Sequence, residues 1–137
     1  MSTETLTNNV TTVTAIYEAF GRGDLPFILS NIADDCNWIA MGKGSSAQGG
    51  NYTGEQVADF FNRLLGEVEF IDFNPVAINN AGNKTVAAFG NMNCKARATG
   101  KPYITDWAMR WVFNGDGKVC EYQNYHDTAA LYIANQP

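Results

Sequence analysis

The sequence comprises 137 residues, of which 45% are hydrophobic and 17% charged, a composition typical of one globular domain with a single core. Its formal net charge of −5 argues against binding to nucleic acid or to an anionic membrane surface, because both require a basic face. No apolar run approaches the length of a transmembrane helix, and the first residues lack the pattern of a signal peptide. We therefore expect a single domain over residues 1–137, located in the cytoplasm, with neither a nucleic-acid nor a membrane partner.

Two helices are predicted at the start of the chain. Apolar residues recur at helical spacing from Leu6 to Phe20, which predicts a long first helix over about residues 5–20. Asp24 followed by Pro26 is typical of an N-cap and the first turn of a helix, and predicts a second, short helix.

The middle of the sequence predicts a strand, a loop and a third helix. Residues 36–41 predict a strand that carries Trp38. Residues 42–51 hold four glycines and two serines, and we interpret them as a solvated connector rather than as a mobile mouth over a pocket. Residues 53–56 have the spacing of a capping box, and residues 57–65 continue with apolar positions at helical spacing.

The second half of the sequence predicts long strands. Residues 68–78 read as a strand with a bulge or edge position at Pro75, and residues 85–98 read as a second strand. A hairpin over residues 103–128 and a short closing helix over residues 129–134 complete the chain. Helices followed by antiparallel strands predict an α+β fold: a cone-shaped, curved antiparallel sheet wraps around the long N-terminal helix and leaves a cavity.

Alternation along the strands gathers aromatic and polar side chains near the only histidine, His126, and the adjacent Asp127. A carboxylate at the rim of an apolar pocket has a raised pKa and can move protons near neutral pH. The alternative role of Asp127 is to cap the closing helix. We expect no metal site, because one histidine and three dispersed cysteines offer no ligand cluster. The candidate ligand contacts are Tyr17, Trp38, Phe89, Asn91, Trp107, Met109, Trp111, Tyr122 and Asn124.

Several segments resemble one superfamily over nearly the whole chain. Residues 19–25, 33–38, 52–57, 113–119 and 125–128 are similar to the corresponding segments of SnoaL-like and ketosteroid-isomerase-like proteins of the nuclear transport factor 2-like group. The resemblance implies a cystatin-like α+β barrel, a homodimer and a small apolar ligand in the cavity. It also implies chemistry without a cofactor, of isomerase, cyclase or hydrolase type.

The catalytic positions of the resembling families match poorly. The positions of the ketosteroid isomerase base, oxyanion-hole acid and tyrosine hold Ala40, Met109 and Ile16, so steroid isomerase activity is not expected. The resemblance to limonene-type epoxide hydrolases and to SnoaL-like cyclases implies in both cases that Asp127 is the acid or base. The epoxide hydrolases also use charged residues on the preceding long strand, where this sequence has Asn91-Met92-Asn93.

Two hypotheses therefore stand. In the first, the protein is a small enzyme in which Asp127 is the base or acid, while His126, Tyr17 and Asn91 orient the substrate or stabilise negative charge. In the second, it is a non-catalytic module for ligand binding or dimerisation. The resemblance leaves the substrate and the reaction type open, because this fold hosts many functions.

Overall fold

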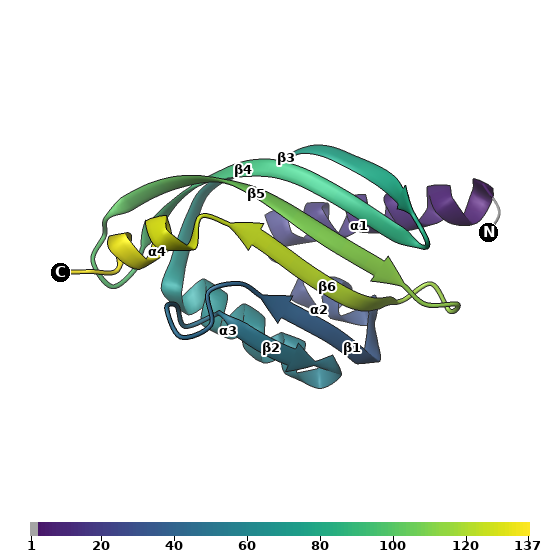
Figure 1. The fold of residues 1–137 in the computed structure, drawn as a ribbon, viewed down its shortest axis with the longest axis horizontal. Coiled ribbons are helices and arrows are strands. Elements are labelled where there is room, and N and C mark those ends of the chain that lie inside the picture. Colours follow the sequence, from purple (N-terminus) through teal and green to yellow (C-terminus); the bar gives the residue numbers. More distant parts are fainter. Residues whose placement is uncertain (1–2) are drawn as a thin grey trace.

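The structure, a computed structural model, describes residues 3–137 and the side chains from residue 8 onward, so the side chain of Leu6 lies outside the described residues. The elements follow the predicted order, with the addition of a short strand, β2 (Figure 1). They are α1 (Thr3–Gly21), α2 (Leu25–Ser30), β1 (Ile32–Ala40), β2 (Gly50–Thr53), the 3-10 turn η1 (Gly54–Gln56), α3 (Val57–Glu67), β3 (Val68–Gly82), β4 (Thr85–Ala96), β5 (Pro102–Phe113), β6 (Val119–His126) and α4 (Thr128–Ala134).

Local sequence signals set the helix ends. After α1, Gly23 adopts a φ of +73°, a conformation that costs glycine little and that stops the helix. The Asp24 carboxylate then accepts a hydrogen bond from Phe27 N at 3.1 Å and caps α2. At the entry to α3 the Gln56 side chain accepts from Thr53 N at 2.9 Å, as the capping-box spacing predicts.

The six strands form one curved, unclosed sheet in the order β2-β1-β6-β5-β4-β3. All neighbours are antiparallel except β1 and β6, which pair in parallel with Trp38 opposite Tyr122. The expectation of an antiparallel sheet is therefore wrong at this one pairing. The register of β3 shifts between Pro75 and Ala77, which confirms the bulge predicted at the proline and bends the strand.

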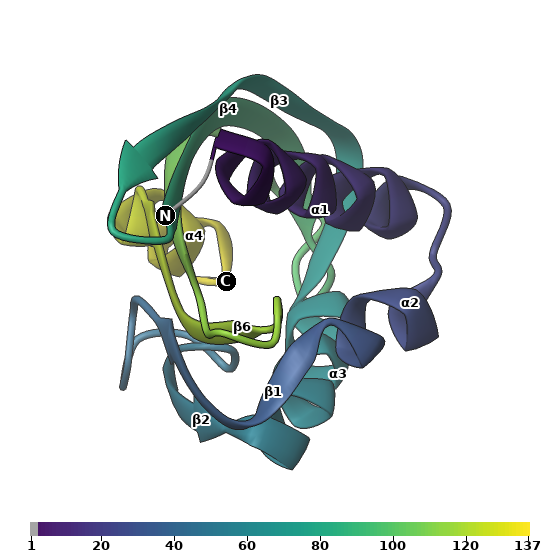
Figure 2. The same cartoon turned by 90° about the vertical axis from the view of Figure 1, so that its right-hand side faces the viewer.

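The helices α1, α2 and α3 lie on the concave, open side of the sheet (Figure 2). The apolar face of α3 packs into this space through Val57, Phe60, Phe61 and Leu64, all buried. Alternation along β4 turns Ala88, Met92 and Cys94 to the same interior. The core thus lies between three helices and a curved sheet, which confirms the predicted α+β architecture.

The cysteines are free thiols; Cys36 and Cys94 are buried, whereas Cys120 is half-buried. Burial raises the pKa of the Cys36 thiol to about 12 and that of Cys94 to about 11, so both stay protonated and unreactive. Within residues 3–137, no group of three or more His, Cys, Asp or Glu side chains is arranged to hold a metal ion. Across the same range, none of the helices is long and apolar enough to span a bilayer.

Candidate functional site

A cavity lies between the helices and the concave face of the sheet, with a volume of about 60 Å³. This is several times the roughly 15 Å³ that one water needs, so a compact molecule can enter. Most of the lining is aromatic: Tyr17, Phe20, Trp38, Phe60, Phe61, Phe70, Phe73, Tyr103, Trp107, Trp111 and Tyr122. Ile16, Ile28, Leu64, Met92 and Met109 add apolar surface, and Gln48, Asn124 and His126 are the polar members.

Two stacked pairs of rings give the cavity flat walls. Trp38 and Tyr122 lie opposite each other on β1 and β6, and their rings stack at 3.7 Å between centroids and 18° between planes. Trp107 stacks on Phe73 at 4.9 Å and 5°. These pairs give the cavity the shape that a flat ring would fill.

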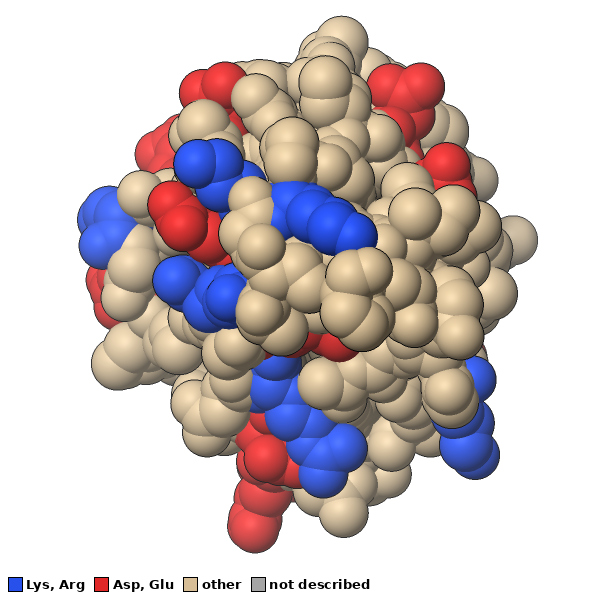
Figure 3. Space-filling model, turned by 90° about the vertical axis from the view of Figure 1, so that its left-hand side faces the viewer, with Lys and Arg blue, Asp and Glu red and all other residues tan. Residues whose placement is uncertain are grey.

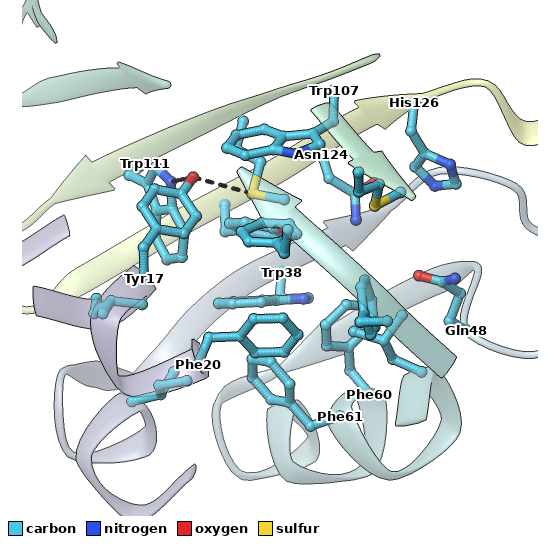
Figure 4. A pocket seen from close by; sticks show the side chains of 18 of the residues that line it. Tyr17, Phe20, Trp38, Gln48, Phe60, Phe61, Trp107, Trp111, Asn124 and His126 are labelled. Atoms are coloured by element: carbon cyan, nitrogen blue, oxygen red, sulfur yellow. Dashed lines mark hydrogen bonds between the residues drawn. The ribbon is translucent and has the colours of Figure 1, made fainter. Parts of the chain in front are cut away.

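The Tyr17 hydroxyl joins α1 to β5. It accepts a hydrogen bond from Trp111 Nε1 at 2.9 Å and donates to Met109 Sδ at 3.1 Å, as the dashed lines in Figure 4 show. Burial raises the pKa of Tyr17 far above its ordinary value, so the hydroxyl keeps its proton. Tyr17 therefore lines the cavity as predicted, but its hydroxyl is already occupied by the protein.

Asn124 is buried, and its side chain is also engaged by the protein. Its Oδ1 atom accepts a hydrogen bond from Met41 N at 2.9 Å, which fixes the amide between β6 and the end of β1. Burial raises the pKa of Tyr122, although a hydrogen bond with the Asn124 side chain acts in the opposite direction. Asn124 thus holds the cavity wall in place.

Three buried polar atoms in the described residues lack a hydrogen-bond partner: Trp38 Nε1 and both ring nitrogens of His126. The other two indoles differ, because Trp107 Nε1 donates to Asn91 O at 3.1 Å and Trp111 Nε1 donates to Tyr17. Burial lowers the pKa of His126, with the neighbouring Asp127 charge acting against the shift. His126 is therefore neutral near pH 7, with one nitrogen able to donate and the other able to accept.

The loop before β2 forms part of this site, although the connector interpretation is the one that the sequence favours for it over the mouth of a pocket. Gln48 is buried and lines the cavity, while its Nε2 atom donates to Glu67 at 3.4 Å. Glu67 also accepts from Ala47 N at 2.8 Å, and Tyr52 Oη donates to Gln48 O at 2.6 Å. The interpretation of residues 42–51 as a plain connector is thus wrong for Gln48, because the loop is anchored and contributes to the wall.

Asp127 lies outside the cavity. It is exposed, and its Oδ1 atom accepts a hydrogen bond from Ala130 N at 2.9 Å, which makes it the N-cap of α4. Its own backbone N–H donates to Thr105 Oγ1 at 2.9 Å. The expectation that Asp127 is a carboxylate at the pocket is wrong, and the alternative role as a cap is confirmed. The physical reason is alternation: consecutive residues at the end of β6 face opposite ways, and only His126 faces inward.

Asp127→Ala should lower the free energy of unfolding by about 1 kcal/mol, because α4 loses its cap. Ligand affinity should not change, since the carboxylate does not line the cavity. Urea unfolding and a ligand titration measure the two effects. Asp24→Ala, which removes the equivalent cap of α2, is the matched control and should cost a similar amount. A loss of binding in Asp127→Ala alone would contradict this assignment.

Phe89 and Asn91 also lie outside the cavity. Phe89 is 51% exposed on the convex face of the sheet, and Asn91 Oδ1 accepts from Asn74 Nδ2 at 3.0 Å on that same face. Their prediction as ligand contacts is wrong, because the curvature turns their neighbours Gly90 and Met92 inward instead. Only the backbone oxygen of Asn91 reaches a cavity residue, Trp107.

The other predicted contacts do line the cavity: Tyr17, Trp38, Trp107, Met109, Trp111, Tyr122 and Asn124. His126, predicted as a catalytic residue together with Asp127, lines it too. The lining residues that the prediction missed lie mainly on the helices and on β3. They include Phe20, Gln48, Phe60, Phe61, Phe70 and Phe73. The amphipathic pattern of α1 and α3 was the available signal, because the apolar face of each helix must point at the concave sheet.

The sequence profile of the SnoaL-like domain matches residues 13–122. The chain belongs to the SnoaL-like family. This SnoaL-like protein matches none of the curated proteins. Its fold resembles an NTF2-like protein of unknown function from Burkholderia pseudomallei, with 25% identity, a TM-score of 0.85 and coverage of 100% of both chains.

Two further solved structures share the fold of the SnoaL-like chain. An NTF2-like protein from Burkholderia thailandensis has 26% identity and a TM-score of 0.83, over 94% of this chain and 98% of that one. A protein with a ketosteroid isomerase-like fold from Catenulispora acidiphila has 18% identity and a TM-score of 0.73, over 90% and 91%. The resemblance drawn from the sequence is thereby confirmed at the level of family and fold.

Proposed function

We propose that this SnoaL-like protein binds a compact, mostly apolar molecule in the cavity between its helices and its sheet. The observation that carries the proposal is the lining, in which eleven aromatic side chains border a space of about 60 Å³. Concave sites lined by aromatic groups with a few polar atoms are the usual form of small-molecule sites.

Titration with ethylbenzene, followed by ligand-observed NMR, tests the proposal. Wild-type protein should bind saturably, and Met92→Phe should weaken binding at least about tenfold, because the larger ring fills the cavity. Ile104→Phe makes a comparable change on the exposed convex face and should leave affinity unchanged. Absence of saturable binding to the wild-type protein would refute the proposal.

Proton transfer without a cofactor is the second candidate function, and the specific observation in its favour is His126. A neutral imidazole with both nitrogens unpartnered inside the cavity can accept a proton from a bound molecule. The test is exchange of the methylene protons of phenylacetone in D₂O, followed by NMR. Exchange should exceed that of buffer with the wild-type protein and fall to the buffer rate with His126→Gln. Exchange at the buffer rate in both would leave the protein as a binder.

We also propose that the convex face of the sheet pairs with a second copy of this chain. Phe89, Ala108 and Tyr125 form one row across β4, β5 and β6, and Phe89 and Tyr125 are exposed. Ile104 on the same face is 72% exposed. Apolar groups gathered in this way favour an interface. The cytoplasmic location stays a prediction.

Sedimentation of the wild-type protein should give a dimer, and Ile104→Lys should give a monomer, because a buried lysine would lack a partner. Ile133→Lys places the same charge on an exposed residue of α4 and should leave the dimer intact. A wild-type monomer at high concentration would exclude this interface.

A further inference from the structure

Among the three indole N–H groups of the protein, that of Trp38 is the one without an acceptor. Trp38 is only 1% exposed, so water does not satisfy this donor from the surface. Trp107 and Trp111 sit in the same wall and have their N–H groups paired with protein atoms. A buried donor without a partner costs stability, and a molecule that brings an acceptor to it recovers that free energy on binding.

The free indole nitrogen belongs to a polar end of the cavity. In Figure 4 the nitrogen of Trp38 points to the side of the cavity on which Asn124, His126 and Gln48 lie. Asn124 and Gln48 have hydrogen bonds to other protein groups, whereas both nitrogens of His126 are unpartnered. Among the described residues, Trp38 Nε1 and the two ring nitrogens of His126 are thus the fully buried side-chain atoms here that have no hydrogen-bond partner.

The lining residues that the structure describes include no Asp, Glu, Lys or Arg. Charged groups of both signs do lie on the outer surface, as Figure 3 shows for one end of the molecule. An ionised group inside the cavity would lose its hydration without gaining an opposite charge. The lining therefore selects against charged molecules.

We infer that the ligand is a compact, uncharged aromatic carbonyl compound whose oxygen accepts a hydrogen bond from Trp38 Nε1, with His126 at the same polar end. The inference rests on the proposed binding function and specifies its chemistry. The stacked rings of the wall fit a flat ring of the ligand, and the free indole N–H fits its hydrogen-bond acceptor. The neutral lining fits a ligand without charge.

Three ligands of nearly equal shape test the inference on the wild-type protein: ethylbenzene, acetophenone and benzoate. We expect acetophenone to bind about tenfold more tightly than ethylbenzene, the gain of one buried hydrogen bond. Benzoate should bind at least about tenfold more weakly than acetophenone, because its charge finds no partner. Equal affinities for ethylbenzene and acetophenone, or tightest binding of benzoate, would overturn the inference while leaving the binding function intact. Failure of both neutral ligands to bind would instead refute the binding function itself.

A pair of matched variants identifies the donor. Trp38→Phe removes the free N–H and keeps a ring, so the preference for acetophenone over ethylbenzene should fall from about tenfold to about onefold. Trp107→Phe removes an N–H that is already bonded to Asn91 O, so both affinities should shift alike and the preference should persist. A preference that survives in Trp38→Phe would overturn the assignment of the donor. Because the ranking of the three ligands is measured on the wild-type protein, the inference stays falsifiable even where Trp38→Phe does not fold.

Discussion

Gly90→Ala should lower the free energy of unfolding by about 2 kcal/mol or more, the larger part of the usual range for overpacking. A Cβ at Gly90 would clash with Trp107 Cζ2 and with the backbone oxygen of Asn74, because both lie closer than real Cβ contacts do. Neither neighbour can move freely: Trp107 stacks on Phe73 and donates to Asn91 O, and Asn74 belongs to the paired strand β3. The absence of a side chain at position 90 is therefore what lets the Trp107 wall form.

Urea unfolding measures the loss, and near-UV circular dichroism reports on the displaced indole. Gly66→Ala is the matched control, because a Cβ there meets nothing within 4 Å in the helix α3. That variant should be neutral or slightly stabilising, since alanine favours the helix over glycine. If Gly90→Ala were as stable as the wild-type protein, the packing of Trp107 against the β4 backbone would be wrong.

Acidification below about pH 6.5 should destabilise the protein through His126. Burial lowers the pKa of His126 in the folded state below the value of about 6.5 that it has in the unfolded chain. Below about pH 6.5 the unfolded chain therefore binds a proton that the folded protein does not. The stability contributed by neutral His126 is complete above pH 6.5 and is lost as the pH falls from there toward the folded pKa, at up to about 1.4 kcal/mol per pH unit.

The free energy of unfolding, measured from about pH 7.5 to about pH 5.5, checks whether stability falls on acidification. His126 is the only histidine of the chain, so His126→Phe removes the titration and keeps a ring in its place. The variant should show a flatter pH profile than the wild-type protein. Identical profiles would mean that the imidazole is not buried in its neutral form, and a wild-type protein that gains stability on acidification would reverse the sign.

Much of the fold follows from short-range signals in the sequence. The periodicity from Val10 to Phe20 predicts α1, the Asp24 cap predicts α2, and Pro75 marks the bulge in β3. The parallel pairing of β1 with β6 does not follow, because residues about eighty positions apart form it and no local pattern encodes their direction.

The site was predictable in part. Alternation assigns Trp107, Trp111, Tyr122 and His126 to a common interior, and the structure places them there. The same alternation leaves open which face of β4 is concave. The inner positions there are small, so the pattern wrongly favours the larger Phe89 as the inner residue. Whether an indole N–H has an acceptor depends on residues that are distant in the sequence. Trp38 and Trp107 each carry such an N–H, and only the three-dimensional arrangement shows that the N–H of Trp107 is bonded and that of Trp38 is not.

The structure also changes which residue carries the proton-transfer hypothesis. As drawn from the sequence, the hypothesis depends on the Asp127 carboxylate, and in the structure that carboxylate caps α4. What persists is the neighbouring His126, whose pKa is lowered by burial and which lines the same cavity as the free indole donor of Trp38. Recognition of an uncharged ligand and any transfer of its protons would thus occur at the same polar end of the cavity.

The three indole N–H signals in a ¹H–¹⁵N spectrum provide the most direct test of ligand recognition, with each signal assigned from its Trp→Phe variant. On titration with acetophenone, the Trp38 signal should move most, because its donor gains a hydrogen bond that it lacks in the free protein. The Trp107 and Trp111 signals should move less, since those donors are already bonded. A titration in which acetophenone binds but the Trp38 signal stays in place, while either of the other two moves, would contradict the proposed mode of recognition.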